Sequence, residues 1–200
     1  MGRDEEIARL AEKAGRGDEI AFASLVRWTE GLVNGVVGRL LGDPHETEEV
    51  AQEVYVDAYR ALARWEPGAK FTTWLYRAAT NAALEKRRSR TRYRRHLAEA
   101  AATRRETAAE APDASRGPEG AELALAVREA VDALPDGQRA TFVLRHYQDL
   151  PLAEIARARG VAIGTVKAQL SQAVTNLRRA LGPWLGTALG EGSGKSEERT

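Results

Sequence analysis

Residues 70–77, read as KFTTWLYR, combine side-chain types that bind nucleic acid. Three aromatic side chains lie there beside two basic groups and two hydroxyls. Aromatic rings can stack on unpaired bases while cations contact the backbone of the strand. Asn81 follows on the same expected helix, and its amide could bond a base edge. The stretch therefore predicts a contact with single-stranded nucleic acid, although at least one of Phe71, Trp74 and Tyr76 is expected to lie in the core.

A dense basic cluster follows at residues 86–95, KRRSRTRYRR, which holds seven basic side chains and no acid. The chain as a whole carries a net charge of only +1, so the cluster stands out from its surroundings. Seven cations can neutralise several phosphates. Lysine and arginine at a helix C-terminus also suit the helix dipole, so the cluster alone leaves both interpretations open.

A helix-turn-helix pattern occupies residues 142–181. Apolar residues of a first short helix precede Gly160, a glycine suited to the turn, and Val166, Leu170 and Leu177 then recur at helical spacing. In this motif the start of the second helix enters the DNA major groove. The side chains placed to read bases are Thr165, Lys167, Gln169 and Ser171. An ordinary helical hairpin in an all-α core is the alternative.

The helix expected from Pro44 to Trp65 has a polar face that includes two apolar groups, Tyr55 and Val56. Solvation is the default role of such a face. Apolar groups among acids also suit docking to a basic partner helix. The other residues of this face are Glu49, Gln52, Glu53, Asp57 and Arg60.

Composition argues against several functions. The chain has no cysteine, and its three histidines, His45, His96 and His146, share no metal-ligand spacing. No phosphate-binding glycine loop or nucleophile motif is present, so we expect no catalysis, no metal and no cofactor. The charged N-terminal residues and the lack of a long apolar run predict a cytoplasmic protein without membrane insertion.

The elements that position these residues are all expected to be helical, because alanine, leucine, arginine and glutamate dominate and β-type alternation is rare. We predict an all-α fold of two small helical domains joined by a flexible linker, the second domain containing the helix-turn-helix. Asp18 and Asp43 are expected to cap helices, and Thr72 or Thr73 to cap a helix beginning at Trp74. The predicted divisions are a first domain at 1–95, a linker at 96–120, a second domain at 121–184 and a disordered tail at 185–200.

Four segments, in this order along the chain, resemble the conserved motifs of bacterial RNA polymerase sigma factors of the extracytoplasmic-function group. EEVAQEVY (48–55) is similar to the region 2 helix that binds core polymerase, and FTTWLYRAATNAA (71–83) to the segment that melts the promoter and reads its −10 element. LPDGQR (134–139) and VLR (143–145) resemble the start of region 4. EIA (154–156) through GTVK (164–167) resembles its helix-turn-helix.

The resemblance implies a role for each motif. The face of Glu49, Gln52 and Glu53, with Val56 and Asp57, would bind the coiled coil of the polymerase β′ subunit, and Leu144 and Tyr147 would face the β flap. The loop between Trp65 and Phe71 would hold a flipped base, and the linker would thread toward the RNA exit channel. The residues implied at the −10 element are Lys70, Phe71, Thr73, Trp74, Arg77, Asn81, Lys86, Arg87 and Arg88, and those at the −35 element are Thr165, Lys167, Gln169 and Ser171. Core RNA polymerase, promoter DNA and an anti-sigma factor are the implied partners.

Two departures from the family pattern matter. Pro151 stands where many members have a capping serine, and Lys167 is the only cation of the recognition helix before Arg178. Fewer phosphate contacts lower affinity, so we predict either weak autonomous −35 binding or a −35 sequence read through glutamine and serine side chains. In both cases promoter affinity should depend strongly on Lys167.

Two other functions are compatible with parts of the sequence. The first is a free-standing, dimeric helix-turn-helix regulator with a sensor domain, but a sensor needs a pocket and not a flat polar face. The second is an interaction protein, a decoy that binds polymerase and has lost promoter recognition. The cation-poor recognition helix is the feature that favours the decoy.

Overall fold

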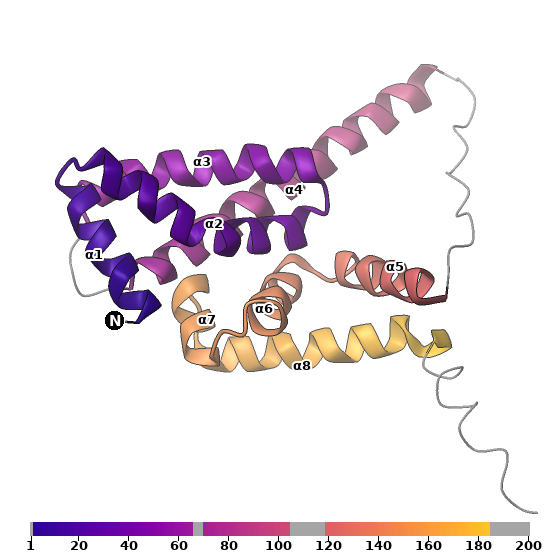
Figure 1. Cartoon of the computed structure of the whole chain (residues 1–200). Coiled ribbons are helices and arrows are strands. Elements are labelled where there is room, and N and C mark those ends of the chain that lie inside the picture. The colour runs from indigo at the N-terminus through magenta and orange to yellow at the C-terminus, as the bar shows by residue number, and fades with distance from the viewer. Residues whose placement is uncertain (1, 66–69, 105–118, 185–200) are drawn as a thin grey trace, which may run out of the picture.

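The computed structural model describes residues 2–65, 70–104 and 119–184, and within these ranges it consists of eight α-helices without a strand (Figure 1). This confirms the predicted all-α class. The helices are α1 (Arg3–Gly15), α2 (Glu19–Leu41), α3 (Pro44–Leu62), α4 (Phe71–Arg104), α5 (Glu119–Asp132), α6 (Asp136–His146), α7 (Leu152–Arg159) and α8 (Ile163–Ala180).

Local signals set the helix ends of the first domain, which comprises α1 to α4. The carboxylate of Asp18 accepts a hydrogen bond from the amide of Ala21 at 2.9 Å, and Asp43 does the same for Glu46 at 2.9 Å. These bonds confirm the two predicted N-caps. Between them α2 ends at Gly42, whose positive φ of 72° suits a residue without a Cβ. Helix α2 therefore begins where the predicted Asp18 cap placed a helix start.

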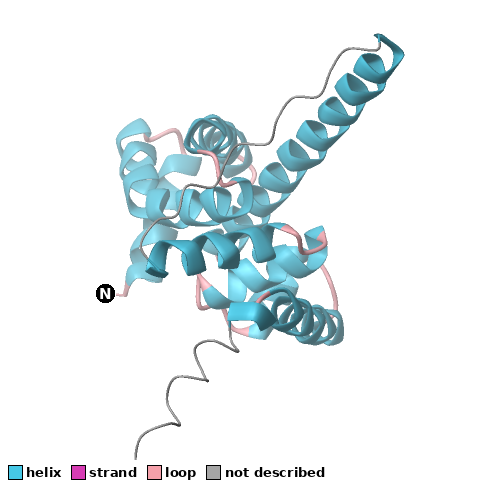
Figure 2. Ribbon diagram, turned by 90° about the vertical axis from the view of Figure 1, so that its right-hand side faces the viewer, coloured by secondary structure: helices cyan, strands magenta, loops and turns pink. Residues whose placement is uncertain are grey.

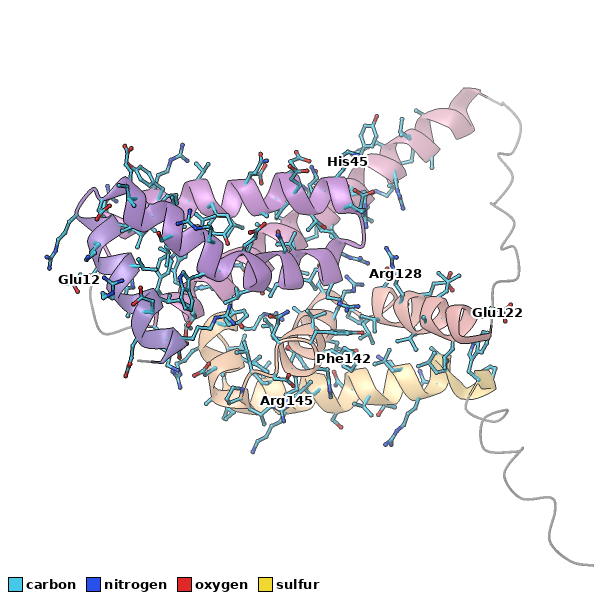
Figure 3. The ribbon with its side chains drawn as sticks, viewed as in Figure 1. Glu12, His45, Glu122, Arg128, Phe142 and Arg145 are labelled. Atoms are coloured by element: carbon cyan, nitrogen blue, oxygen red, sulfur yellow. The ribbon has the colours of Figure 1, made fainter. Side chains whose placement is uncertain are left out.

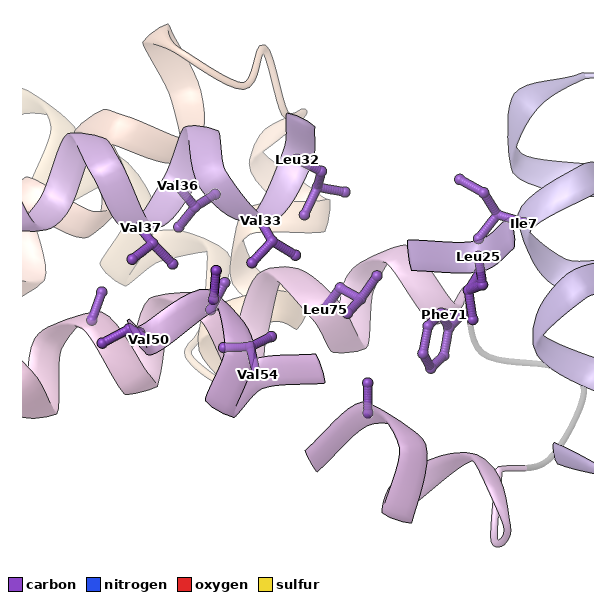
Figure 4. Packing of buried hydrophobic residues seen from close by; sticks show 14 of the residues in the cluster. Ile7, Leu25, Leu32, Val33, Val36, Val37, Val50, Val54, Phe71 and Leu75 are labelled. Atoms are coloured by element: carbon purple, nitrogen blue, oxygen red, sulfur yellow. The ribbon is translucent and has the colours of Figure 1, made fainter. Parts of the chain in front are cut away.

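Helix α2 is the centre of the first domain, because it contacts α1, α3 and α4. Its Val33, Val36 and Val37 are fully buried (Figure 4). They pack in one cluster with Val54 of α3 and Leu75 of α4. Fully burying each such side chain contributes about 2 kcal/mol, so this cluster holds the α3 and α4 surfaces in fixed positions.

The second domain comprises α5 to α8, and its turn has the predicted chemistry. Gly160 ends α7 with a positive φ of 64°, and α8 begins three residues later. Pro151 precedes α7 without a side-chain cap, as the sequence departure implies. Ile155 of α7 and Val166 of α8 are fully buried, so the two helices of the motif are fixed against each other.

Arg139 ties the turn between α5 and α6 together. It is only 3 % exposed and donates hydrogen bonds to the carbonyl oxygens of Val131, Asp132 and Leu134. Burial, followed by the nearby charge of Arg87, lowers the pKa of Arg139 to about 10, so the guanidinium stays protonated at neutral pH. A charged donor therefore satisfies three carbonyls where the backbone leaves the helix.

Replacing this side chain should destabilise the second domain. We expect Arg139→Met, which keeps a similar volume, to lower the free energy of unfolding by about 3 kcal/mol, because buried carbonyls would lose their donor. Urea unfolding followed by circular dichroism measures this loss. Arg179→Met, on the exposed side of α8, is the matched control and should change stability by about 0.5 kcal/mol or less. Equal stability of the two variants would contradict the assignment.

One predicted helix start was wrong, because α4 begins at Phe71, before the threonines expected to cap it. The same helix continues to Arg104, so the first residues of the predicted linker are helical. Helix α5 begins at Glu119, two residues before the predicted domain start. The rest of the predicted linker, the loop residues 66–69 and the predicted tail lie outside the described residues.

Candidate nucleic-acid interface

The aromatic residues at the start of α4 form a cluster with Trp65. Phe71 and Trp74 stack with centroids 5.7 Å apart, and Trp65 meets Phe71 edge-on at 5.9 Å. Phe71 is only 2 % exposed, so it is a core residue and not the predicted DNA contact. Trp74 is partly buried and keeps ring surface for a ligand. Trp65 Nε1 is buried and has no hydrogen-bond partner among the described residues.

Polar residues continue from this cluster along the outer face of α4. Arg77 and Asn81 are exposed, and they follow Trp74 at steps of three and four residues. Residues at these steps share one face of a helix. The structure therefore brings together Trp74, Arg77 and Asn81 as one surface, with Thr73 partly buried at its edge.

The basic cluster is largely paired inside the protein. Lys86 Nζ lies 2.6 Å from Glu49 Oε2, and Arg90 Nη1 lies 2.7 Å from Glu46 Oε2, so both cations join α4 to α3. The hydrogen bond to Glu49 raises the pKa of the Lys86 ammonium. Sequence spacing could not reveal these pairs, because their partners are 37 and 44 residues away.

The predicted polymerase-binding face of α3 is exposed as expected. Gln52 and Glu53 are exposed, Val56 is 50 % exposed, and Asp57 lies 3.6 Å from Arg60 in an exposed pair. Tyr55, in contrast, points inward and bonds Thr29 through its hydroxyl at 3.1 Å. The face is thus an acidic surface with Val56 as its apolar group.

The recognition helix α8 exposes three of its four predicted base-reading residues. Thr165, Lys167 and Ser171 are exposed, but Gln169 accepts a hydrogen bond from Thr141 Oγ1 at 2.7 Å. Gln169 faces α6, so its assignment to the DNA surface was wrong. The buried positions Val166, Ala173 and Leu177 instead place Ala168, Thr175 and Arg178 on the outer side, and this period is readable in the sequence.

The two domains are held together by an interdomain clasp, which comprises the pairs Arg87–Asp132, Lys70–Glu154 and Arg39–Tyr147. Arg87 Nη1 lies 3.0 Å from Asp132 Oδ1, and Lys70 Nζ lies 3.1 Å from Glu154 Oε1. The Arg39 guanidinium covers the Tyr147 ring at 4.4 Å. Hydrogen bonds to Asp4 and then to Glu154 raise the pKa of Lys70.

The interface between the two domains has an apolar centre and polar contacts at its edge. Leu144, Leu150 and Ile155 of the second domain belong to the same buried cluster as the core of the first. Arg128 of α5 reaches the carbonyl oxygen of Gly42, at the α2–α3 turn (Figure 3). Leu144 is fully buried, so in this arrangement it cannot face the β flap as predicted, while Tyr147 is 36 % exposed.

The described ranges contain no group of three histidine, aspartate or glutamate side chains arranged to hold a metal ion. Nor does any helix within them have the length and apolarity needed to cross a bilayer.

Comparison with known families matches both helical units. Residues 25–93 match the model of Sigma-70 region 2, and residues 124–177 match that of Sigma-70, region 4. The chain is 32 % identical over 180 residues to the ECF RNA polymerase sigma factor SigW of Bacillus subtilis, covering 88 % of this chain and 96 % of the relative. It is 31 % identical over 200 residues to the RNA polymerase sigma-H factor of Pseudomonas aeruginosa, covering 92 % and 98 %.

Solved structures share the fold. The chain superposes on CnrH, solved in complex with the cytosolic domain of CnrY, with a TM-score of 0.64 and 24 % identity over 89 % of this chain and 98 % of that one. It superposes on the sigma factor RpoE of Bartonella quintana, solved with the anti-sigma factor NepR, with a TM-score of 0.60 and 20 % identity over 80 % and 96 %.

Proposed function

The chain belongs to the sigma-70 family, in the extracytoplasmic-function group of RNA polymerase sigma factors, and on this premise we propose how its two domains divide the work of promoter recognition. It is a non-enzymatic factor that directs promoter-specific transcription initiation. One observation supports the division: the two family regions fall on α2 to α4 and on α5 to α8, and each set of helices presents an exposed face of the required chemistry.

The first domain binds core RNA polymerase through α3. We assign the β′ coiled-coil contact to Glu49, Gln52, Glu53, Val56 and Asp57, which are exposed on one helix. An acidic face steers association with a basic partner, and an apolar group near its centre is typical of residues that dominate binding energy. Tyr147 remains the candidate for the β flap, because part of its ring is exposed.

The same domain opens and reads the −10 element through α4. Trp74 stacks on an unpaired base, Asn81 bonds a base edge, and Arg77 contacts the backbone, with Thr73 at the edge of the surface. Extruding a base from the duplex costs a few kcal/mol, which stacking on an aromatic ring offsets. Lys70, Lys86, Arg87 and Arg88 bind phosphates once their carboxylate partners are exchanged for DNA.

The second domain reads the −35 element through the exposed side of α8. Thr165 and Ser171 offer hydroxyls to base edges, and Lys167 supplies a cation beside them. These three side chains are exposed in the closed arrangement, and the main contacts of α8 are with α5, α6 and α7. The −35 surface is therefore available while the interdomain clasp is closed.

We also propose an anti-sigma factor as a partner and the cytoplasm as the site of action. A groove between α2, α3 and α5 is lined by Glu48, Gln52 and Tyr55 among others, so a protein bound in it would cover part of the α3 face. Such a factor should compete with core polymerase for the chain in a binding assay. Simultaneous binding of both would contradict this placement.

Run-off transcription with purified core RNA polymerase and a genomic promoter library tests the whole assignment. With the chain present, we expect sequence-selective transcripts that share −35 and −10 motifs, and none without it. Polymerase binding without transcripts would support the decoy function. Failure to bind core polymerase would favour a free-standing helix-turn-helix regulator.

A further inference from the structure

One continuous stripe of exposed side chains runs along the outer face of α4. From Trp74, steps of three and four residues lead through Arg77 and Asn81 to further residues on the same face. All members beyond Trp74 are exposed. The members that follow Asn81 are Glu85, Arg88, Arg92 and Arg95. The proposed −10 surface therefore does not end at the body of the first domain but continues along the helix as a line of arginines.

The second half of α4 projects away from both domains (Figure 2). Residues 91–100 are exposed on every side of the helix. Isolated helices of this length are marginal in water, and packing normally supplies most of their stability. A negatively charged partner would therefore stabilise this projecting basic helix.

The ion pairs on this stripe are weak and local. Glu85 is shared by Arg88 at 3.0 Å and Arg92 at 3.3 Å, and Arg95 lies 3.7 Å from Glu99. All five side chains are 55 % to 67 % exposed. Exposed pairs of this kind contribute about 0 to 1 kcal/mol, so the arginines can exchange carboxylates for phosphates at little expense.

We propose that Arg92 and Arg95 contact the phosphate backbone of the duplex just upstream of the −10 element. This inference rests on the proposed function of Asn81 and Arg77. Fourteen residues separate Asn81 from Arg95, a helical rise of about 21 Å, which spans roughly six base pairs. In this placement the C-terminal end of α4 points upstream, over the spacer between the two elements.

The contact carries no sequence information, because phosphates are the same at every base pair. It strengthens and orients the complex on any spacer sequence. Glu85 lies within the stripe and repels the phosphate backbone of the DNA, so it limits the strength of the arginine contacts. The salt dependence of promoter binding is the direct readout of such contacts.

Holoenzyme assembled from core polymerase and the full chain should bind a complete double-stranded promoter about fivefold more weakly at 0.1 M salt when it carries Arg92→Gln, and its salt slope should fall by about 0.9. Arg95→Gln should act alike, and the double variant should lose about 1.8 from the slope. Glu85→Gln should bind a few-fold more tightly. On a short fork DNA that keeps the −10 element but lacks upstream duplex, all these variants should match the unsubstituted chain.

Arg94→Gln is the matched control. Arg94 is exposed, adjacent in sequence and equal in charge, but it is turned about 200° around the helix from Arg92. The inference would be overturned if Arg92→Gln and Arg94→Gln had the same salt slope. It would also be overturned if Arg92→Gln weakened binding to the fork DNA as much as binding to the complete promoter. If the proposed function itself is wrong, the unsubstituted chain will form no promoter-specific complex at all, so the two failures are distinguishable.

Discussion

Reversing the charge of Glu53 is expected to weaken binding to core RNA polymerase by about a hundredfold. The side chain is exposed near the middle of the α3 face, beside Val56. A like-charge contact with a basic partner costs several kcal/mol, and each 1.4 kcal/mol is a factor of about ten in affinity. Fluorescence anisotropy of the labelled chain titrated with core polymerase measures the change for Glu53→Lys.

The control for this experiment is Glu12→Lys, which makes the same charge change at an exposed position of α1. We expect that variant to bind polymerase as the unsubstituted chain does. Val56→Ala should fall between the two, with a loss of about tenfold, because it removes the apolar group and leaves the acids in place. If Glu53→Lys and Glu12→Lys bind equally well, the polymerase does not contact this face.

The second large effect is expected at Trp74. Replacing it with alanine should reduce open-complex formation on a double-stranded promoter by about thirtyfold, since stacking of one base on an aromatic ring contributes about 1 to 3 kcal/mol. Permanganate reactivity of unpaired thymines reports the open complex. Core polymerase should still bind the variant normally, because α3 is unchanged.

Trp28 offers a matched control in the same domain, since it is 44 % exposed on α2 and is not among the residues proposed to contact DNA. Trp28→Ala should form open complexes at the normal rate. A promoter with a preformed bubble should restore most of the activity of Trp74→Ala, because the strands no longer need to be separated. A defect that persists unchanged on the bubble template would show that the substitution damages the fold and not the melting step.

The sequence was informative wherever one short segment determined the structure. The Asp18 and Asp43 caps were predictable from short local patterns, and the structure confirms both. The turn at Gly160 was predictable for the same reason, because the need for positive φ is local. The four family motifs added the order of the two regions along the chain.

The wrong assignments share a different cause, which is contact between distant segments. Phe71 has the composition of a base-stacking residue but is covered by the first domain, and Gln169 is turned toward Thr141, 28 residues away. Lys86 belongs to a run of cations in the sequence, but in the fold α3 places Glu49 beside it. Residue types predict what a side chain can bind, but packing decides which of its possible partners it meets.

The interdomain clasp gives promoter recognition an energetic threshold. Lys70 and Arg87, two proposed phosphate contacts, are occupied by Glu154 and Asp132 in the closed form. If closed molecules outnumber open ones by a given factor, the apparent affinity of any ligand that requires the open form drops by about that factor. A β flap contact through the buried Leu144 would also require the open form. Polymerase and −10 DNA would then each remove the penalty for the other, so they would bind cooperatively. Chromosomal DNA alone would leave most molecules of this protein in the closed form. Stable promoter binding would then require the assembled holoenzyme.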